Sequence, residues 1–268
     1  MPLIANLRAF TETLRISFRS TSESKMSVFF SFMNTIVVTL ILFGIFQIAF
    51  AQHGTIRGFT FAAAIWSLSM YSLWWGIGIR NIYKDIANTI KDGSIETRLV
   101  RPQHFLSYIT AMRLGKQVNF FVLQIIVNAA LLLWLIGLPP IDPTFIWLVS
   151  MATLFFGGMI VALLMYICIG LTTFWLEDST PVMWIVDKST MILGGSFVPV
   201  ALLPALVRRF AEWSPFGAVM LFAQAFAPDF AIRFTSLFLS QLLWTTVLGL
   251  LCITMWNRGR KRIAINGG

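Results

Sequence analysis

The chain has 268 residues and a formal net charge of +9, with 57% of its residues hydrophobic and only 12% charged. This composition, with its positive mean hydropathy, is typical of an integral membrane protein and leaves no room for a separate soluble domain. The basic residues lie in short loops beside apolar blocks, as orientation signals and lipid contacts do. We therefore expect membrane lipid, and no nucleic acid, as their partner.

Residues 1–25 predict an amphipathic helix. One helical face collects the apolar side chains Leu3, Leu7, Phe10, Leu14 and Phe18. Another face collects Arg8, Arg15 and Arg19 together with Glu12. This separation predicts a helix that lies in the membrane interface with its cations toward the lipid headgroups.

Six apolar blocks predict an all-α integral membrane protein with six transmembrane helices in a single domain, residues 1–268. Most of these blocks hold the roughly 20 apolar residues that a bilayer crossing needs. We expect crossings at 26–51, 59–79, 118–137 and 145–175, in a fifth block containing Asp187 and Lys188, and at 231–256. Cys168 and Cys252 lie inside these blocks, so we expect packing residues and neither a disulfide framework nor a metal site.

The long polar segment 80–116 lies between the second and third predicted crossings and carries seven of the twenty Lys and Arg residues. Ile82, Ile86 and Ile90 recur every four residues, which predicts a helix with one apolar stripe. This helix should end at Asp92-Gly93, and Ser94 should cap a second short helix with Glu96 near its start. A solvated loop that only sets topology is the alternative.

Two later features interrupt the apolar blocks. Asp187 and Lys188 could belong to a translocation path, or they could simply lie at the aqueous end of their helix. Four prolines then divide the region 194–229 into pieces too short to cross a membrane: Pro199, Pro204, Pro215 and Pro228. Such pieces predict short re-entrant helices on the extracytoplasmic side, at about 197–230.

The distribution of charge predicts the orientation. With the first residues inside, sixteen Lys and Arg residues lie on the inner side and four on the outer side. This asymmetry satisfies the positive-inside rule, so both termini and the 80–116 segment are expected in the cytosol.

The chain lacks the motifs of an enzyme. No GxxxxGK[ST] loop is present, and neither HExxH nor GxSxG occurs. The two histidines, His53 and His104, are predicted on opposite sides of the membrane, where they cannot share a metal or acid–base site. We therefore expect a non-catalytic protein that contains no cofactor of its own.

Several short stretches resemble the permease subunits of type-two ABC exporters. The first runs from Ile90 to Glu96 with Leu99-Val100-Arg101-Pro102, between the second and third crossings. The others are Leu193 to Pro199, Leu203-Pro204 and Ser214-Pro215-Phe216, after the fifth block. The resemblance implies two permeases, identical or homologous, in a bacterial inner membrane, and separate ATPase subunits that bind ATP and Mg.

The resemblance also implies roles for individual residues. A cytosolic coupling helix would contact the ATPase through Asp85, Ile86, Ile90, Lys91, Asp92, Gly93 and Glu96, with Arg101 and Pro102 shaping the return. The translocation path or gate would include Asp187, Lys188, Phe197 and Pro199. Abundant Phe, Trp and Met favour a lipophilic or amphiphilic substrate, such as a drug, lipid or peptide. A channel or secondary-transporter subunit and a non-transporting membrane scaffold remain alternatives.

Overall fold

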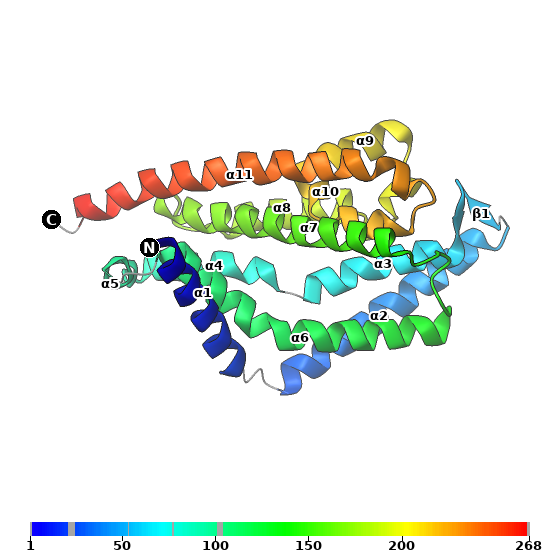
Figure 1. Cartoon of the computed structure of the whole chain (residues 1–268), viewed down its shortest axis with the longest axis horizontal. Helices are drawn as coiled ribbons and strands as arrows, with labels where there is room; N and C mark the ends of the chain where they lie inside the picture. The colour runs from blue at the N-terminus through cyan, green and yellow to red at the C-terminus, as the bar shows by residue number, and fades with distance from the viewer. Residues whose placement is uncertain (1, 21–24, 53, 77, 101–103, 267–268) are drawn as a thin grey trace.

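The computed structural model describes residues 2–20, 25–52, 54–76, 78–100 and 104–266, which form an elongated bundle of helices (Figure 1). The α-helices are α1 (Pro2–Arg19), α2 (Lys25–Phe50), α3 (Phe61–Gly76), α4 (Ile82–Lys91), α5 (Ile95–Leu99), α6 (Phe105–Leu135), α7 (Phe145–Leu171), α8 (Thr180–Leu193), α9 (Ala205–Trp213), α10 (Pro215–Ala218) and α11 (Phe230–Asn266). The 3-10 helices are η1 (Ile79–Asn81), η2 (Thr172–Phe174), η3 (Val200–Leu202) and η4 (Leu221–Phe226). Strands β1 (Thr55–Ile56) and β2 (Phe59–Thr60) pair as a small antiparallel ribbon.

Within the described residues, four helical stretches are long and apolar enough to cross a membrane: Phe29–Phe50, Phe105–Leu135, Phe145–Phe174 and Phe230–Arg262. The other two predicted crossings correspond to α3 and α8, which have 16 and 14 residues. At 1.5 Å per residue these helices are roughly 24 and 21 Å long, shorter than a hydrocarbon core of about 30 Å. The six-crossing arrangement therefore stays a prediction.

The segment 80–116 is mostly helical rather than an extended loop. It contains α4 and α5, and its last residues already belong to α6, which begins at Phe105 and not near residue 118. The helix continues through charged positions because Arg113 is paired with Asp85 while Phe105 and Ile109 are buried. The C-terminal helix likewise continues beyond Trp256, so that the basic cluster is part of α11.

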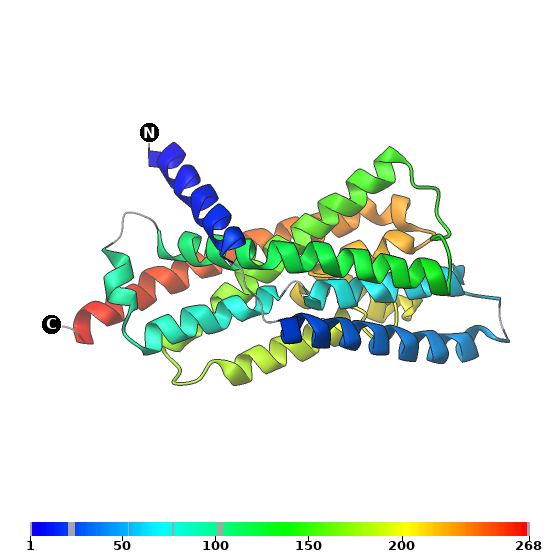
Figure 2. The same ribbon diagram turned by 90° about the horizontal axis from the view of Figure 1, so that it is seen from below.

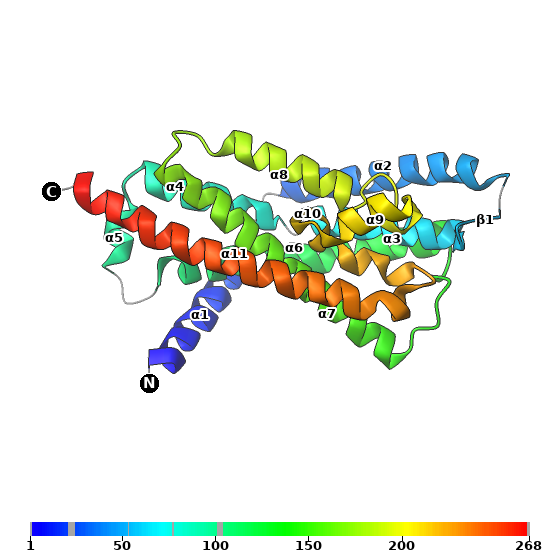
Figure 3. The same ribbon diagram turned by 90° about the horizontal axis from the view of Figure 1, so that it is seen from above.

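Helix α1 packs against the start of α6 and projects from the bundle at an angle (Figure 2). The two helices come close at Gly115, where a Cβ atom would lie only 2.4 Å from the carbonyl oxygen of Leu14. Both termini lie at the same end of the bundle as α4 and α5, whereas β1 lies at the opposite end (Figures 1 and 3).

The proline-rich region consists of four short helices, and its last piece, η4, is completely buried. Side chains from the long helices hold the backbone of this region. Ser67 of α3 donates to the Ala223 carbonyl at 2.8 Å, and Trp147 of α7 donates to the Ala225 carbonyl at 2.8 Å. Gly158 of α7 lets the backbone approach, since a Cβ atom there would lie 2.2 Å from the Val219 oxygen. None of the four helices is long enough to cross a bilayer.

Candidate coupling and translocation site

The turn between α4 and α5 forms a tip at the end of the bundle that also holds the termini (Figure 1). Helix α4 ends at Lys91 and Gly93 adopts a φ of 72°, which confirms the predicted stop. The predicted cap by the Ser94 side chain is wrong, because that side chain makes no capping bond. Instead the Asp92 carboxylate accepts a hydrogen bond from the Ser94 amide at 2.9 Å, and hydrogen bonds from Ser94 lower the pKa of Asp92.

The predicted ATPase-contact residues divide into an exposed group and a buried group. Lys91, Asp92, Gly93 and Glu96 are exposed at the tip. Ile86 is fully buried and Ile90 is partly buried, because the apolar stripe of α4 packs against the core of this chain. The stripe is therefore not available to an outside partner in this structure. Arg101 and Pro102 lie outside the described residues.

Three contacts join α4 to its neighbours. Gly170 of α7 leaves space for Ile86, since a Cβ atom at position 170 would lie 2.8 Å from the Ile86 Cβ. Arg113 of α6 binds the Asp85 carboxylate through two nitrogens, with Nε 2.8 Å from Oδ2, and both side chains are mostly buried. Lys91 Nζ lies 3.8 Å from Asp178 Oδ1 before α8, but both groups are exposed and this pair contributes little stability.

A further set of polar contacts, around Asp187, links α8 to α7 and to η1, the 3-10 helix directly before α4. Asp187 accepts a hydrogen bond from the Tyr166 hydroxyl of α7 at 2.6 Å, and Arg80 of η1 lies 3.5 Å from its other oxygen. Asp187 is buried and lies roughly 10 Å along α8 from its first residue, at 1.5 Å per residue. It is therefore enclosed by protein rather than placed at the end of its helix. Lys188, its neighbour, is exposed, with its ammonium 5.6 Å from the Trp184 ring centre.

A cavity of about 530 Å³ lies between α2, α3 and α8. Seven of its lining residues are serines, threonines or asparagine, with hydroxyl or amide groups: Ser31, Asn34, Thr35, Thr39, Ser69, Ser72 and Ser196. Aromatic residues and one cation also line it: Tyr71, Trp75, Phe197 and Lys188. The cavity thus combines apolar walls with a few hydrogen-bonding groups, as ligand pockets commonly do.

The structure separates the four residues predicted for the path or gate. Lys188 and Phe197 line the cavity, whereas Asp187 bonds to Tyr166 and Pro199 is buried before η3. Sequence reasoning missed the hydroxyl groups of α2 and α3. Their signal was readable, because Ser31, Thr35 and Thr39 recur every four residues in an otherwise apolar helix.

Comparison with known proteins gives one family. A family model described as ABC-2 family transporter protein matches residues 34–267, from α2 to the end of α11. No curated protein matches the sequence significantly. The matched region includes α4, α5 and every residue that lines the cavity except Ser31. The chain therefore belongs to the ABC-2 family of transporter proteins, the membrane-spanning permeases of ABC transporters.

Proposed function

We propose that this chain is the permease subunit of an ATP-driven exporter, that it pairs with a second permease, and that separate ATPase subunits drive it from the cytosol. The observation that carries the proposal is the exposed α4–α5 tip on a helix whose apolar side is packed into the bundle. An element of this kind transmits a push to the crossings because it cannot bend independently of them.

The exposed end of the tip is the proposed contact with the ATPase. Its charged residues Lys91, Asp92 and Glu96 lie around Gly93 in the chain, and Val100, the residue after α5, has 87% of its surface exposed. A small apolar contact with a polar rim is the usual composition of a protein interface. ATP and Mg belong to the ATPase in this arrangement, and this chain supplies no catalytic residue.

Movement of the tip would reach the cavity through α4. The Asp85–Arg113 pair connects α4 to α6, and Ile86 against Gly170 connects it to α7. The contact between Arg80 and Asp187 connects η1, directly before α4, to α8. Helix α8 also carries Lys188, which lies in the cavity wall. The same rigid-body movement would therefore change both the tip and the cavity.

The cavity supports a lipophilic or amphiphilic substrate. Its walls come largely from apolar and aromatic side chains, which suit an acyl or aromatic body. Its hydroxyl groups and the exposed Lys188 ammonium suit a polar or anionic end. The charge distribution supports an orientation with both termini in the cytosol. The family favours a bacterial inner membrane as the location.

Co-purification tests the proposal and separates it from its alternatives. The protein is solubilised gently from its native membrane, and the proteins that accompany it are identified by mass spectrometry. We expect an ATPase with a Walker loop in about equal amount, with or without a second permease. A channel or a scaffold would retain its function when that ATPase is inactivated, whereas the exporter loses it.

A pair of charge reversals tests the tip. Glu96→Lys changes an exposed residue of α5, and Glu177→Lys changes an exposed residue in the connection between α7 and α8. Because a misplaced charge at an interface weakens association, we expect Glu96→Lys to weaken ATPase binding about tenfold and Glu177→Lys to leave it nearly unchanged. Equal ATPase binding and equal transport in both variants would exclude α5 as the contact.

A further inference from the structure

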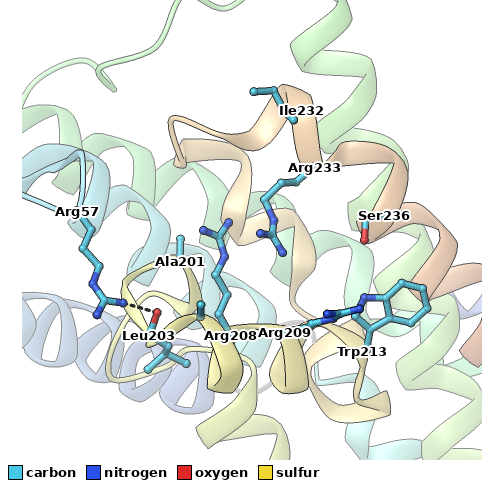
Figure 4. Close-up of a pocket in the computed structure, with 10 residues that line it drawn as sticks. Arg57, Ala201, Leu203, Arg208, Arg209, Trp213, Ile232, Arg233 and Ser236 are labelled. Carbon is cyan, nitrogen blue, oxygen red and sulfur yellow. Dashed lines mark hydrogen bonds between the residues drawn. The ribbon is translucent and has the colours of Figure 1, made fainter.

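A second cavity lies at the end of the bundle opposite the termini and holds four arginines (Figure 4). It has a volume of about 640 Å³ and is formed by the β1–β2 turn, the η3–α9 region and the first two turns of α11. Its arginines are Arg57, Arg208, Arg209 and Arg233. We refer to it as the arginine pocket.

Two of these arginines are held by carboxylates. Arg208 binds Glu212 at 2.8 Å and Asp229 at 2.8 Å, and Arg233 binds Glu212. The Glu212 side chain is 1% exposed, whereas Arg233 and Asp229 are 31% and 36% exposed, so the network runs from a buried carboxylate to the floor of the pocket. Figure 4 shows the guanidinium groups of Arg208 and Arg233 approaching each other there. Even in this network, the buried Nε of Arg233 has no hydrogen-bond partner among the described residues.

The other two arginines leave positive charge and hydrogen-bond donors unused. Arg57 uses only Nη1, which donates to the carbonyl oxygens of Leu202 and Leu203 at 3.1 and 2.6 Å. Arg209 is exposed and makes no ion pair or hydrogen bond within the described part of the chain. Each guanidinium carries five N–H donors, so most of the donors of these two residues are free. The four arginines face two carboxylates, which leaves an excess of two positive charges.

The backbone at Arg57 indicates that its position is imposed by its surroundings. Arg57 has a φ of 51°, in the left-handed region, and Gly58 follows with a φ of 79°. A residue other than glycine in this conformation is disfavoured and needs compensating contacts. Here the tight turn between β1 and β2 directs the guanidinium to η3, beside the pocket (Figure 4).

The surroundings of the pocket suit an amphiphile. Ile232 belongs to the first turn of a helix long enough to cross the membrane, and 87% of its surface is exposed. Leu206 and Phe210 of α9 are 82% and 65% exposed. A cationic pocket beside exposed apolar side chains, at the start of a membrane-spanning helix, matches a phosphate headgroup with attached hydrocarbon.

We propose that the arginine pocket binds the phosphate group of an amphiphile at the membrane surface, with Arg57 and Arg209 as the contacting residues. Their planar guanidinium forks match two phosphate oxygens at once. Arg208 and Arg233 hold the floor of the pocket through Glu212. This site is separate from the cavity between α2, α3 and α8, and it does not depend on ATPase coupling.

Binding to the purified full-length protein in a neutral detergent tests the proposal. Dioctanoyl phosphatidic acid is titrated, and binding is followed by microscale thermophoresis at low salt. We expect saturable binding that weakens about tenfold in Arg209→Gln. The matched control is Arg258→Gln, an exposed residue near the other end of α11, which should bind as the wild type does. Dioctanoylglycerol, which lacks the phosphate, should not compete.

Inorganic phosphate distinguishes the two sources of this anion. If it does not displace the short-chain lipid at millimolar concentration, the site recognises phosphate together with its hydrocarbon. If it binds and displaces the lipid, the site recognises phosphate itself and a soluble phosphate ester is the ligand. Arg57→Gln provides a second variant, and its folding is checked because it loses the bonds to Leu202 and Leu203. Unsaturable binding, or equal binding in Arg209→Gln and Arg258→Gln, overturns the proposal.

Discussion

Replacement of Gly170 by alanine tests whether α4 is packed rigidly against α7. A Cβ atom at this position would lie 2.8 Å from Ile86 Cβ, 3.0 Å from Ile86 Cγ2 and 3.1 Å from the Tyr83 carbonyl oxygen. Carbon atoms in ordinary contact are about 3.5–4.0 Å apart, so α4 has to move away by about 1 Å. Overpacking of this kind costs about 1–3 kcal/mol.

A matched control isolates the clash from the gain in helix propensity. Gly249 is also a helical glycine, in α11, and a Cβ atom there would meet nothing within 4 Å. Gly249→Ala should therefore be neutral or stabilise the protein by about 0.5–1 kcal/mol. Gly170→Ala gains the same propensity but loses the packing, so we expect a net destabilisation of about 1–2 kcal/mol.

Thermal unfolding of the purified protein in detergent measures the difference. At about 2–4 °C per kcal/mol, Gly170→Ala should unfold several degrees below Gly249→Ala. ATPase-driven transport provides the second readout, because a displaced α4 should reduce transport per ATP hydrolysed while ATPase binding at the tip is retained. Equal melting temperatures for the two variants would refute the close packing of α4 on α7.

Three further predictions concern Asp187, the pair Cys168 and Cys252, and His104. Asp187→Leu leaves the Tyr166 hydroxyl without its acceptor and should lower the free energy of unfolding by about 1–3 kcal/mol. Asp187→Asn keeps an acceptor oxygen and should lower it less. The melting temperatures of both variants check this. The Sγ atoms of Cys168 and Cys252 are 3.0 Å apart, so diamide, which takes up the two electrons and two protons, should join them in a disulfide. Mass spectrometry of the linked peptides should detect it, and Cys252→Ser should prevent it. Burial lowers the pKa of His104 below its ordinary 6.5, so the unfolded chain binds the proton more tightly. Stability should therefore fall as the pH drops below about 6.5 toward this lowered pKa, and His104→Gln should weaken that dependence in melts recorded against pH.

Several features could be predicted from the sequence because local chemistry decides them. A run of about 20 apolar residues specifies a membrane helix wherever it packs, as the stretches around α2, α7 and α11 illustrate. The end of α4 at Gly93 follows from the conformational freedom of glycine and needs no tertiary contact. The family resemblance depended on short motifs of this local kind, and the match over residues 34–267 confirms it.

Other features depended on which segments come together. The period of Ile82, Ile86 and Ile90 indicates an apolar stripe but not its partner, and the stripe packs into this chain rather than remaining exposed. Asp85 and Arg113 are 28 positions apart, and Cys168 and Cys252 are 84 apart, so no local pattern predicts their contacts.

In membrane proteins the contacts between helices are especially hard to predict from the sequence. Lipid is as apolar as the protein core, so hydrophobicity alone does not reveal which face of a helix meets lipid and which meets protein. The arginines of the arginine pocket, for example, come from three separate segments and form a site only through tertiary packing. Sequence by itself therefore determined the class of protein, the family and the end of α4. Tertiary packing decided which polar groups converge, because close contact between helices is what selects their faces.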